Sequence, residues 1–170
     1  RRTAIAHSYF VRPDQLTSYK AQGIGASMMP PHLMLYGDQL IKYLGPERAT
    51  MESPLQSALA LGLNATLHCD YPSASPNMLE SIGAAVTRTT VSGQLMGPQE
   101  RVSPYAALLA ATRNVAHTYR DEGHKGTISV GKIADLVILD ENPLTVAPEK
   151  IKEIKVLETI KRGRTIYKQG

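Results

Sequence analysis

Three short apolar segments, each followed by a stretch with helical spacing, constrain the fold of this chain most strongly. They cover residues 3–7 (TAIAH), 24–29 (IGASMM) and 64–70 (NATLHCD). Parallel strands need a long crossover between them, and a helix usually provides it. Strands that alternate with helices therefore indicate βα units around a parallel sheet. The order of elements predicts an α/β fold with three such units.

Proline, glycine and capping residues mark the ends of the predicted helices. Asn77 and Ser103 are side chains of the type that caps a helix N-terminus. Pro30 and Pro31 open a long segment, residues 30–50, which we expect to be a loop because neither a helix interior nor a central strand tolerates proline. The predicted helices cover residues 13–23, 51–63, 77–90 and 102–120.

The C-terminal segment has a different pattern. Residues 126–140 place a Gly131-Lys132 turn between two β-rich segments, and Arg162-Gly163 marks a second turn further on. Turns of this kind between β-rich segments are typical of hairpins. We therefore expect two parts, an α/β body over residues 1–125 and a small β-structure over residues 126–170.

Composition narrows the classes of protein. The chain has 170 residues, enough for one sizeable core, with 42% apolar and 20% charged residues as in ordinary globular proteins. The net charge of +4 is dispersed, without the basic and aromatic pattern of a nucleic-acid surface. No segment is long and apolar enough to predict a membrane span. The single cysteine, Cys69, excludes an internal disulfide and fits a cytoplasmic location.

Polar side chains follow all three predicted strands. His7 ends the first, His32 follows the second by a few residues, and Asp70 ends the third. Ligand and active sites of parallel α/β folds form at this carboxyl edge. A catalytic zinc ion takes histidine nitrogens and carboxylate oxygens and keeps a position for water. Alternatively, Asp70 only begins a turn before Pro72, and His7 is a polar strand end.

Three blocks of sequence resemble a known family. They cover residues 3–38, 67–88 and 126–144, and the last contains the pattern G-x-I-x-x-G-K-x-A-D-L-V-x-L-D. In this order they resemble the C-terminal part of the amidohydrolase superfamily. The most similar branch is amidohydrolase family 3, which includes N-substituted formamide deformylases.

The resemblance implies a (β/α)8 barrel with an attached β-sandwich, of which this chain would hold strands six to eight and part of the sandwich. It implies that His7 and Asp70 are metal ligands and that Asp70 is also the catalytic residue that activates water. Substrate contacts would come from His32, Tyr71 and Ser73. Members often have Glu and Ser where this chain has Ala6 and Cys69. The loss of Glu at position 6 removes no metal ligand and bears on tuning of the metal more than on its binding.

The resemblance also implies that most of the site lies outside this chain. The family's H-x-H pair and the ligands of its fourth and fifth strands have no counterpart here, and a complete barrel takes about 250 residues. We therefore expect a C-terminal fragment that is inactive alone. The complete enzyme is expected to hold one or two divalent metal ions, zinc before others, and the isolated fragment to bind metal weakly or not at all. We expect a small-molecule substrate and no nucleic-acid or membrane partner.

Four other residues have structural interpretations. His68 alternates with Asp70 and either lines the pocket or packs through a hydrogen bond. Cys69 lacks a neighbouring cation that would activate a thiol and is expected to be a small buried apolar residue. Asp135 is expected to anchor the sandwich to the barrel. Asn114 is expected to cap or bridge the last helix to that sandwich.

Two hypotheses about function follow. The first is a metal-dependent hydrolase of non-peptide carbon–nitrogen bonds, such as those of amides or formamides. The second is a non-catalytic half-barrel. Apolar strand edges at Ile5 and Leu67 would lead it to self-associate or to pair with a missing N-terminal half.

Overall fold

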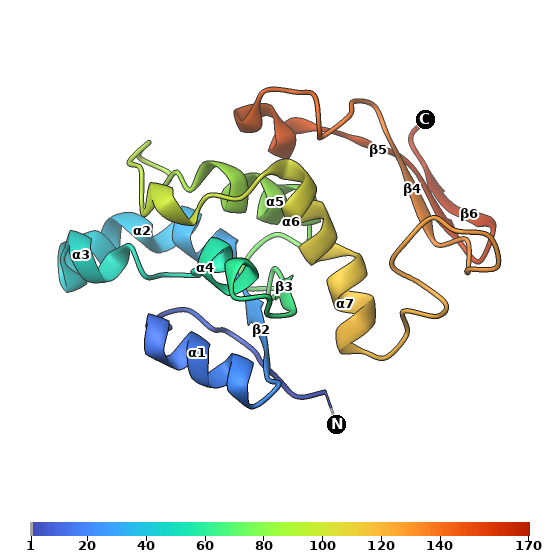
Figure 1. Ribbon diagram of the computed structural model, residues 1–170. Helices are drawn as coiled ribbons and strands as arrows, with labels where there is room; N and C mark the ends of the chain where they lie inside the picture. The colour runs from blue at the N-terminus through green and yellow to red at the C-terminus, as the bar shows by residue number, and fades with distance from the viewer. Residues whose placement is uncertain (1) are drawn as a thin grey trace.

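A parallel three-stranded sheet forms the centre of the larger part of the molecule (Figure 1). The computed structural model describes residues 2–170. The strands are β1 (Ala4–Ile5), β2 (Gly25–Met28) and β3 (Ala65–Leu67), in the order β1-β2-β3. Pairing aligns Ile5 with Ala26 and Met28 with Leu67. The three predicted strands and their parallel arrangement are confirmed.

Helices connect and follow these strands, as the alternating pattern predicts. Their bounds are α1 (Pro13–Ala21), α2 (Pro30–Leu44), α3 (Pro46–Ala49), α4 (Leu55–Ala60), α5 (Met78–Thr87), α6 (Pro104–Ala111) and α7 (Arg113–Thr118). The predicted caps are present, since Asn77 accepts a hydrogen bond from the Leu79 amide and Ser103 from the Ala106 amide.

The predicted loop over residues 30–50 is wrong, because α2 and α3 occupy most of it. Pro30 and Pro31 are the first two residues of α2. Amide groups in the first turn of a helix have no partner within the helix, so proline costs nothing there. The predicted helix over residues 102–120 is divided at Thr112, whose φ of −127° and ψ of −81° separate α6 from α7.

The C-terminal part holds a second, antiparallel sheet of β4 (Leu136–Leu139), β5 (Val156–Lys161) and β6 (Arg164–Lys168), in that order. The predicted hairpin turn at Arg162-Gly163 is confirmed. The predicted strand before Gly131 is wrong. There the Lys132 ammonium group donates to the carbonyl oxygens of Glu122 and Lys125 and to the hydroxyl of Thr127, which folds the segment into a compact loop.

The core lies between the parallel sheet and its helices. It also includes the 3-10 helix η2 (Pro148–Glu153), which packs on α5 through the fully buried Ile151. A shorter 3-10 helix, η1 (Pro98–Glu100), precedes α6. The largest buried apolar side chains include Leu16, Met28, Met29, Leu33, Leu55, Met96 and Ile151.

The two predicted apolar strand edges differ in their exposure to solvent. Ile5 is 38% exposed, as expected, whereas Leu67 is buried. The prediction for Leu67 is wrong because α6 and α7 pack against β3. In residues 2–170, no helix has the length and apolar character that a membrane crossing requires.

Candidate active site

His7 and Asp70 meet at the carboxyl edge of the parallel sheet. His7 Nε2 lies 3.2 Å from Asp70 Oδ2, although the residues are 63 positions apart in sequence and come from the ends of different strands. The His7 imidazole, aided by the Ser73 hydroxyl, holds the pKa of the Asp70 carboxyl below its usual range. Both residues have a left-handed backbone, with φ of 53° and 57°. Non-glycine residues seldom adopt this conformation, although His and Asp do so more often than most, and it recurs at functional sites.

The His7–Asp70 pair fits two positions of a metal site. Two ligands about 2.0–2.1 Å from one tetrahedral zinc ion are separated by about 3.3 Å, close to the observed spacing. Both side chains are partly exposed, at 42% and 38%, so an ion could reach them. Within residues 2–170, however, no three His, Cys, Asp or Glu side chains converge into a group that could hold an ion. The described residues therefore bring only two possible ligands together here.

His68 lies beside this pair and is fixed in orientation. Its Nδ1 lies 2.9 Å from the Ser27 hydroxyl, and its ring meets the His7 ring edge-on at 4.8 Å. Its Nε2 is buried and has no hydrogen-bond partner among the described residues. Burial, with a smaller effect of His7, lowers the pKa of His68. His68 thus lines the site and also makes a packing hydrogen bond, which are the two roles considered from sequence.

Tyr9 and His32 form the adjoining wall. Their rings stack with centroids 4.3 Å apart, and the Tyr9 hydroxyl donates to the buried Met29 sulfur at 3.0 Å. Burial, followed by the charges of Asp70 and Glu52, raises the pKa of Tyr9. His32 thus lies against the segment that follows His7, and its predicted contact with substrate stays a prediction. Tyr9 was not predicted, although its place two residues after His7 would have been a usable signal.

Glu52 and Arg88 are charged residues in the interior next to this wall, and neither was predicted. Both are fully buried, and His32 Nδ1 lies 3.3 Å from Glu52 Oε1. The Arg88 guanidinium donates to the carbonyl oxygens of Met96, Ser53 and Glu52, at 2.8, 3.0 and 2.7 Å. No local sequence pattern distinguishes these two charged residues from surface ones.

The other predicted site residues are placed differently. Ser73 is adjacent to Asp70, since its amide donates to the Asp70 carbonyl at 2.7 Å. Tyr71 is 71% exposed, and no described residue makes a side-chain hydrogen bond with it. Cys69 is only partly buried, so the expectation of a buried residue is wrong.

Two structural expectations for the region after α5 have different outcomes. The prediction that Asn114 bridges the last helix to the small sheet is wrong. The Asn114 Nδ2 donates instead to the carbonyl of Ala65 in β3, at 2.9 Å. Asp135 accepts from the Arg162 amide at 2.8 Å and lies 3.7 Å from the Lys125 ammonium group. It therefore ties the β5–β6 turn to the loop after α7.

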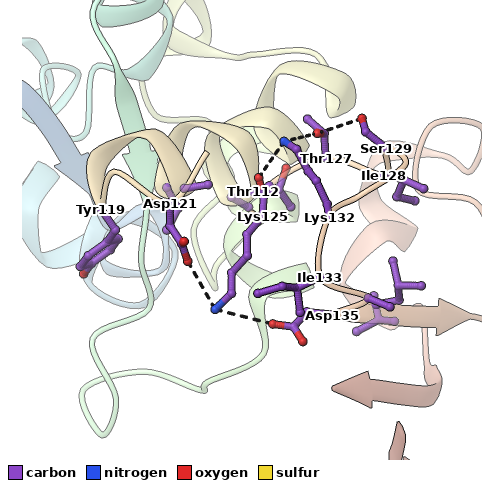
Figure 2. Close-up of a pocket in the computed structure, with 17 residues that line it drawn as sticks. Thr112, Tyr119, Asp121, Lys125, Thr127, Ile128, Ser129, Lys132, Ile133 and Asp135 are labelled. Carbon is purple, nitrogen blue, oxygen red and sulfur yellow. Dashed lines mark hydrogen bonds and ion pairs between the residues drawn. The ribbon is translucent and has the colours of Figure 1, made fainter. Parts of the chain in front are cut away.

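A cavity lies elsewhere in the molecule, away from His7 and Asp70. It has a volume of about 690 Å³ and lies between α6–α7 and the loop that leads into β4. Figure 2 shows Lys125 reaching between Asp121 and Asp135 on its wall, with Ile128 and Ile133 nearby. None of the residues around His7 and Asp70 lines it. The strand-end site is therefore separate from this cavity.

Comparison with known proteins identifies the family. The model of the amidohydrolase family matches residues 1–167. The chain is 36% identical to Protein LONG AFTER FAR-RED 3 of Arabidopsis thaliana over 98% of its length, and 33% identical to N-substituted formamide deformylase of Arthrobacter pascens over 97%. It covers 29% and 31% of these two relatives, so it spans about a third of their length.

The fold agrees with this match. The crystal structure of an uncharacterized metal-dependent hydrolase from Pyrococcus furiosus superposes with a TM-score of 0.70 at 29% identity, over 84% of this chain and 29% of that one. Sequence and fold thus agree over most of the described residues, and the chain belongs to the amidohydrolase family.

Proposed function

We propose that this chain is the C-terminal part of a metal-dependent hydrolase that cleaves non-peptide carbon–nitrogen bonds, such as those of amides or formamides. The contact between His7 and Asp70 at 3.2 Å carries the proposal, because it brings an imidazole nitrogen and a carboxylate oxygen to one point of the sheet edge. The match to N-substituted formamide deformylase supports the class of substrate.

His7 Nε2 and Asp70 Oδ2 would hold the ion, with zinc favoured by the mixed nitrogen and oxygen donors. When bound, such an ion lowers the pKa of a coordinated water toward about 7 and polarises a carbonyl group. The Asp70 carboxylate takes the proton that the attacking water loses and can return it to the departing nitrogen. Because its pKa is not raised, Asp70 is ionised at neutral pH, which is the form that can accept a proton.

His32 and the residues after β3 would contact the substrate. His32 is 23% exposed at its side chain and stacks on Tyr9, so one ring edge faces the site from a fixed wall. Donation from this ring to the carbonyl oxygen would stabilise the negative charge that develops there. Ser73, beside Asp70, and the exposed Tyr71 would complete the contacts on the other side.

The critical test is Asp70→Asn in the full-length protein that contains this chain. We expect turnover of N-substituted formamides, measured as formate release, to fall by about 100-fold or more, because a general acid-base group contributes at least this factor. Asp135→Asn, in the loop far from the site, is the matched control and should retain activity. Turnover of Asp70→Asn within about twofold of the wild type would refute the role of Asp70.

We propose further that residues 1–125 contribute three strands to a larger (β/α)8 barrel, with residues 126–170 in the attached β-structure, and that the chain alone is inactive. Two ligands are fewer than the three protein ligands of a catalytic zinc site. Metal analysis of the isolated chain after dialysis should show much less than one zinc per chain. Stoichiometric zinc would overturn this expectation.

A second candidate, a non-catalytic half-barrel that associates with another chain, is supported by apolar side chains open to solvent. Ile128 is 91% exposed and Val130 fully exposed, beside the large cavity. Association through this region would bury them, and association through β1 would bury Ile5. Sedimentation of the isolated chain distinguishes a monomer from an oligomer, and activity of the full-length protein decides between the two functions.

A further inference from the structure

Glu52 is a buried carboxylate that the proposed chemistry does not use. Its residue is fully buried, and the Ser53 hydroxyl donates to its Oε1 at 3.1 Å. Its second oxygen, Oε2, has no hydrogen-bond partner among the described residues. Placing a carboxylate in such surroundings is costly unless it is paired, so the structure should give it a partner.

The partner is His32. Its Nδ1 is buried 3.3 Å from Glu52 Oε1, within ion-pair distance, and no hydrogen bond to a described residue engages that nitrogen. Tyr9 stacks on the His32 ring, and Tyr36 lies against it with a centroid distance of 5.0 Å. The ring is thus held by packing, with one nitrogen close to a single acidic group.

The backbone around Glu52 is held rigidly. Arg88 donates to the carbonyl groups of Glu52 and Ser53, and the Ser53 amide donates to the Tyr9 carbonyl at 2.7 Å. Residue 52 also pairs with Phe10 in an isolated antiparallel bridge. The same segment that carries Tyr9 and His7 is therefore tied to the segment that carries Glu52.

We infer that Glu52 is a positioning residue, which accepts the Nδ1 proton of His32 and so leaves the other ring nitrogen, Nε2, available to the substrate. A hydrogen bond at one nitrogen of an imidazole fixes the tautomer and thereby the role of the other. This inference rests on the proposed function only for the substrate contact. The pairing of Glu52 with His32 stands on the structure alone.

The first experiment needs no catalytic activity. ¹⁵N-histidine NMR of the chain, with the His32 signals assigned through His32→Gln, reports which ring nitrogen carries the proton. We expect Nδ1 to be protonated in the wild type and to shift toward the unprotonated position in Glu52→Gln. Glu100→Gln is the matched control, because Glu100 is also buried but accepts from the Ser57 amide at the start of α4.

The NMR outcome decides the pairing in either direction. His32 ring signals that are unchanged in Glu52→Gln, or shifted equally in Glu100→Gln, would overturn it. If Glu52→Gln does not fold, Glu52→Asp withdraws the carboxylate by one methylene while keeping the charge. This variant should shift the same His32 signals, and a variant without that shift counts against the pairing.

The second experiment uses the full-length protein. Glu52→Gln should lower kcat by about 10- to 100-fold, by analogy with the loss seen when the hydrogen-bond partner of a metal-ligating histidine is removed. In a His32→Ala background the same substitution should cost less than about twofold, since coupled residues are not additive. An equal loss in both backgrounds would show that Glu52 acts on the fold and not through His32. If the full-length protein shows no hydrolase activity, the proposed function fails, whereas the NMR result still decides the pairing.

Discussion

Replacement of Arg88 by methionine is expected to remove the strongest buried polar anchor of the site. The side chain is 1% exposed and donates three hydrogen bonds to backbone carbonyl groups from Glu52, Ser53 and Met96. Hydrogen bonds from a charged donor contribute about 1.5–3 kcal/mol each. At the lower value, the three bonds together stabilise the fold by about 4–5 kcal/mol.

Part of this lost free energy of unfolding is recovered when methionine replaces Arg88. Burial lowers the pKa of Arg88, against an opposing effect of Glu52 and Glu100, so the buried charge is itself unfavourable. Methionine removes that charge and fills much of the volume. We therefore expect a net decrease of about 3–4 kcal/mol in the free energy of unfolding, a large part of the 5–15 kcal/mol typical of a domain.

Urea unfolding followed by circular dichroism measures this change. Arg101→Met is the matched control, because Arg101 is exposed and donates a single bond, to the Thr87 carbonyl at 2.9 Å. It should cost about 1 kcal/mol or less. Arg88→Lys keeps the charge but not the three-way geometry and should be intermediate. Equal losses for Arg88→Met and Arg101→Met would refute the reasoning.

Two further substitutions test the surroundings of β3. Asn114→Ala leaves the Ala65 carbonyl without its donor inside the core and should cost about 1–2 kcal/mol in the free energy of unfolding, measured in urea. His7→Gln should return the pKa of Asp70 toward its usual value, measured by carboxyl NMR titration. Because that pKa is lowered in the folded state, the contact stabilises the fold above the ordinary pKa of a carboxyl group, and the contribution is lost as pH falls through the lowered value. An Asp70 pKa that does not move in His7→Gln would contradict this.

Local sequence signals predicted the parallel sheet because each strand is a short apolar run and each cap a specific side chain. Asn77 and Ser103 occupy the positions that their chemistry requires. The same signals led to the wrong prediction of a loop at Pro30 and Pro31, because proline is excluded from a helix interior but favoured in its first turn. Without a clear cap before it, α2 could not be distinguished from a loop.

Local sequence signals could not predict which distant parts of the chain are in contact. Strand ends placed His7 and Asp70 at one edge, and the structure brings them together. Arg88 and Glu52 are 36 residues apart, and nothing near either in the sequence shows that both are buried. Asn114 was expected to turn toward the small sheet, because its chemistry specifies a donor and not the carbonyl group that receives it.

The left-handed backbone at His7 and Asp70 has a consequence for any attempt to stabilise this protein. Glycine is the residue that adopts such a conformation most readily, so a selection for thermal stability alone would favour glycine at both positions. The same change would remove both groups proposed to bind the ion. At these two residues, thermal stability and metal binding therefore favour different side chains. Variants chosen only for melting temperature should lose the proposed metal-binding groups before other features.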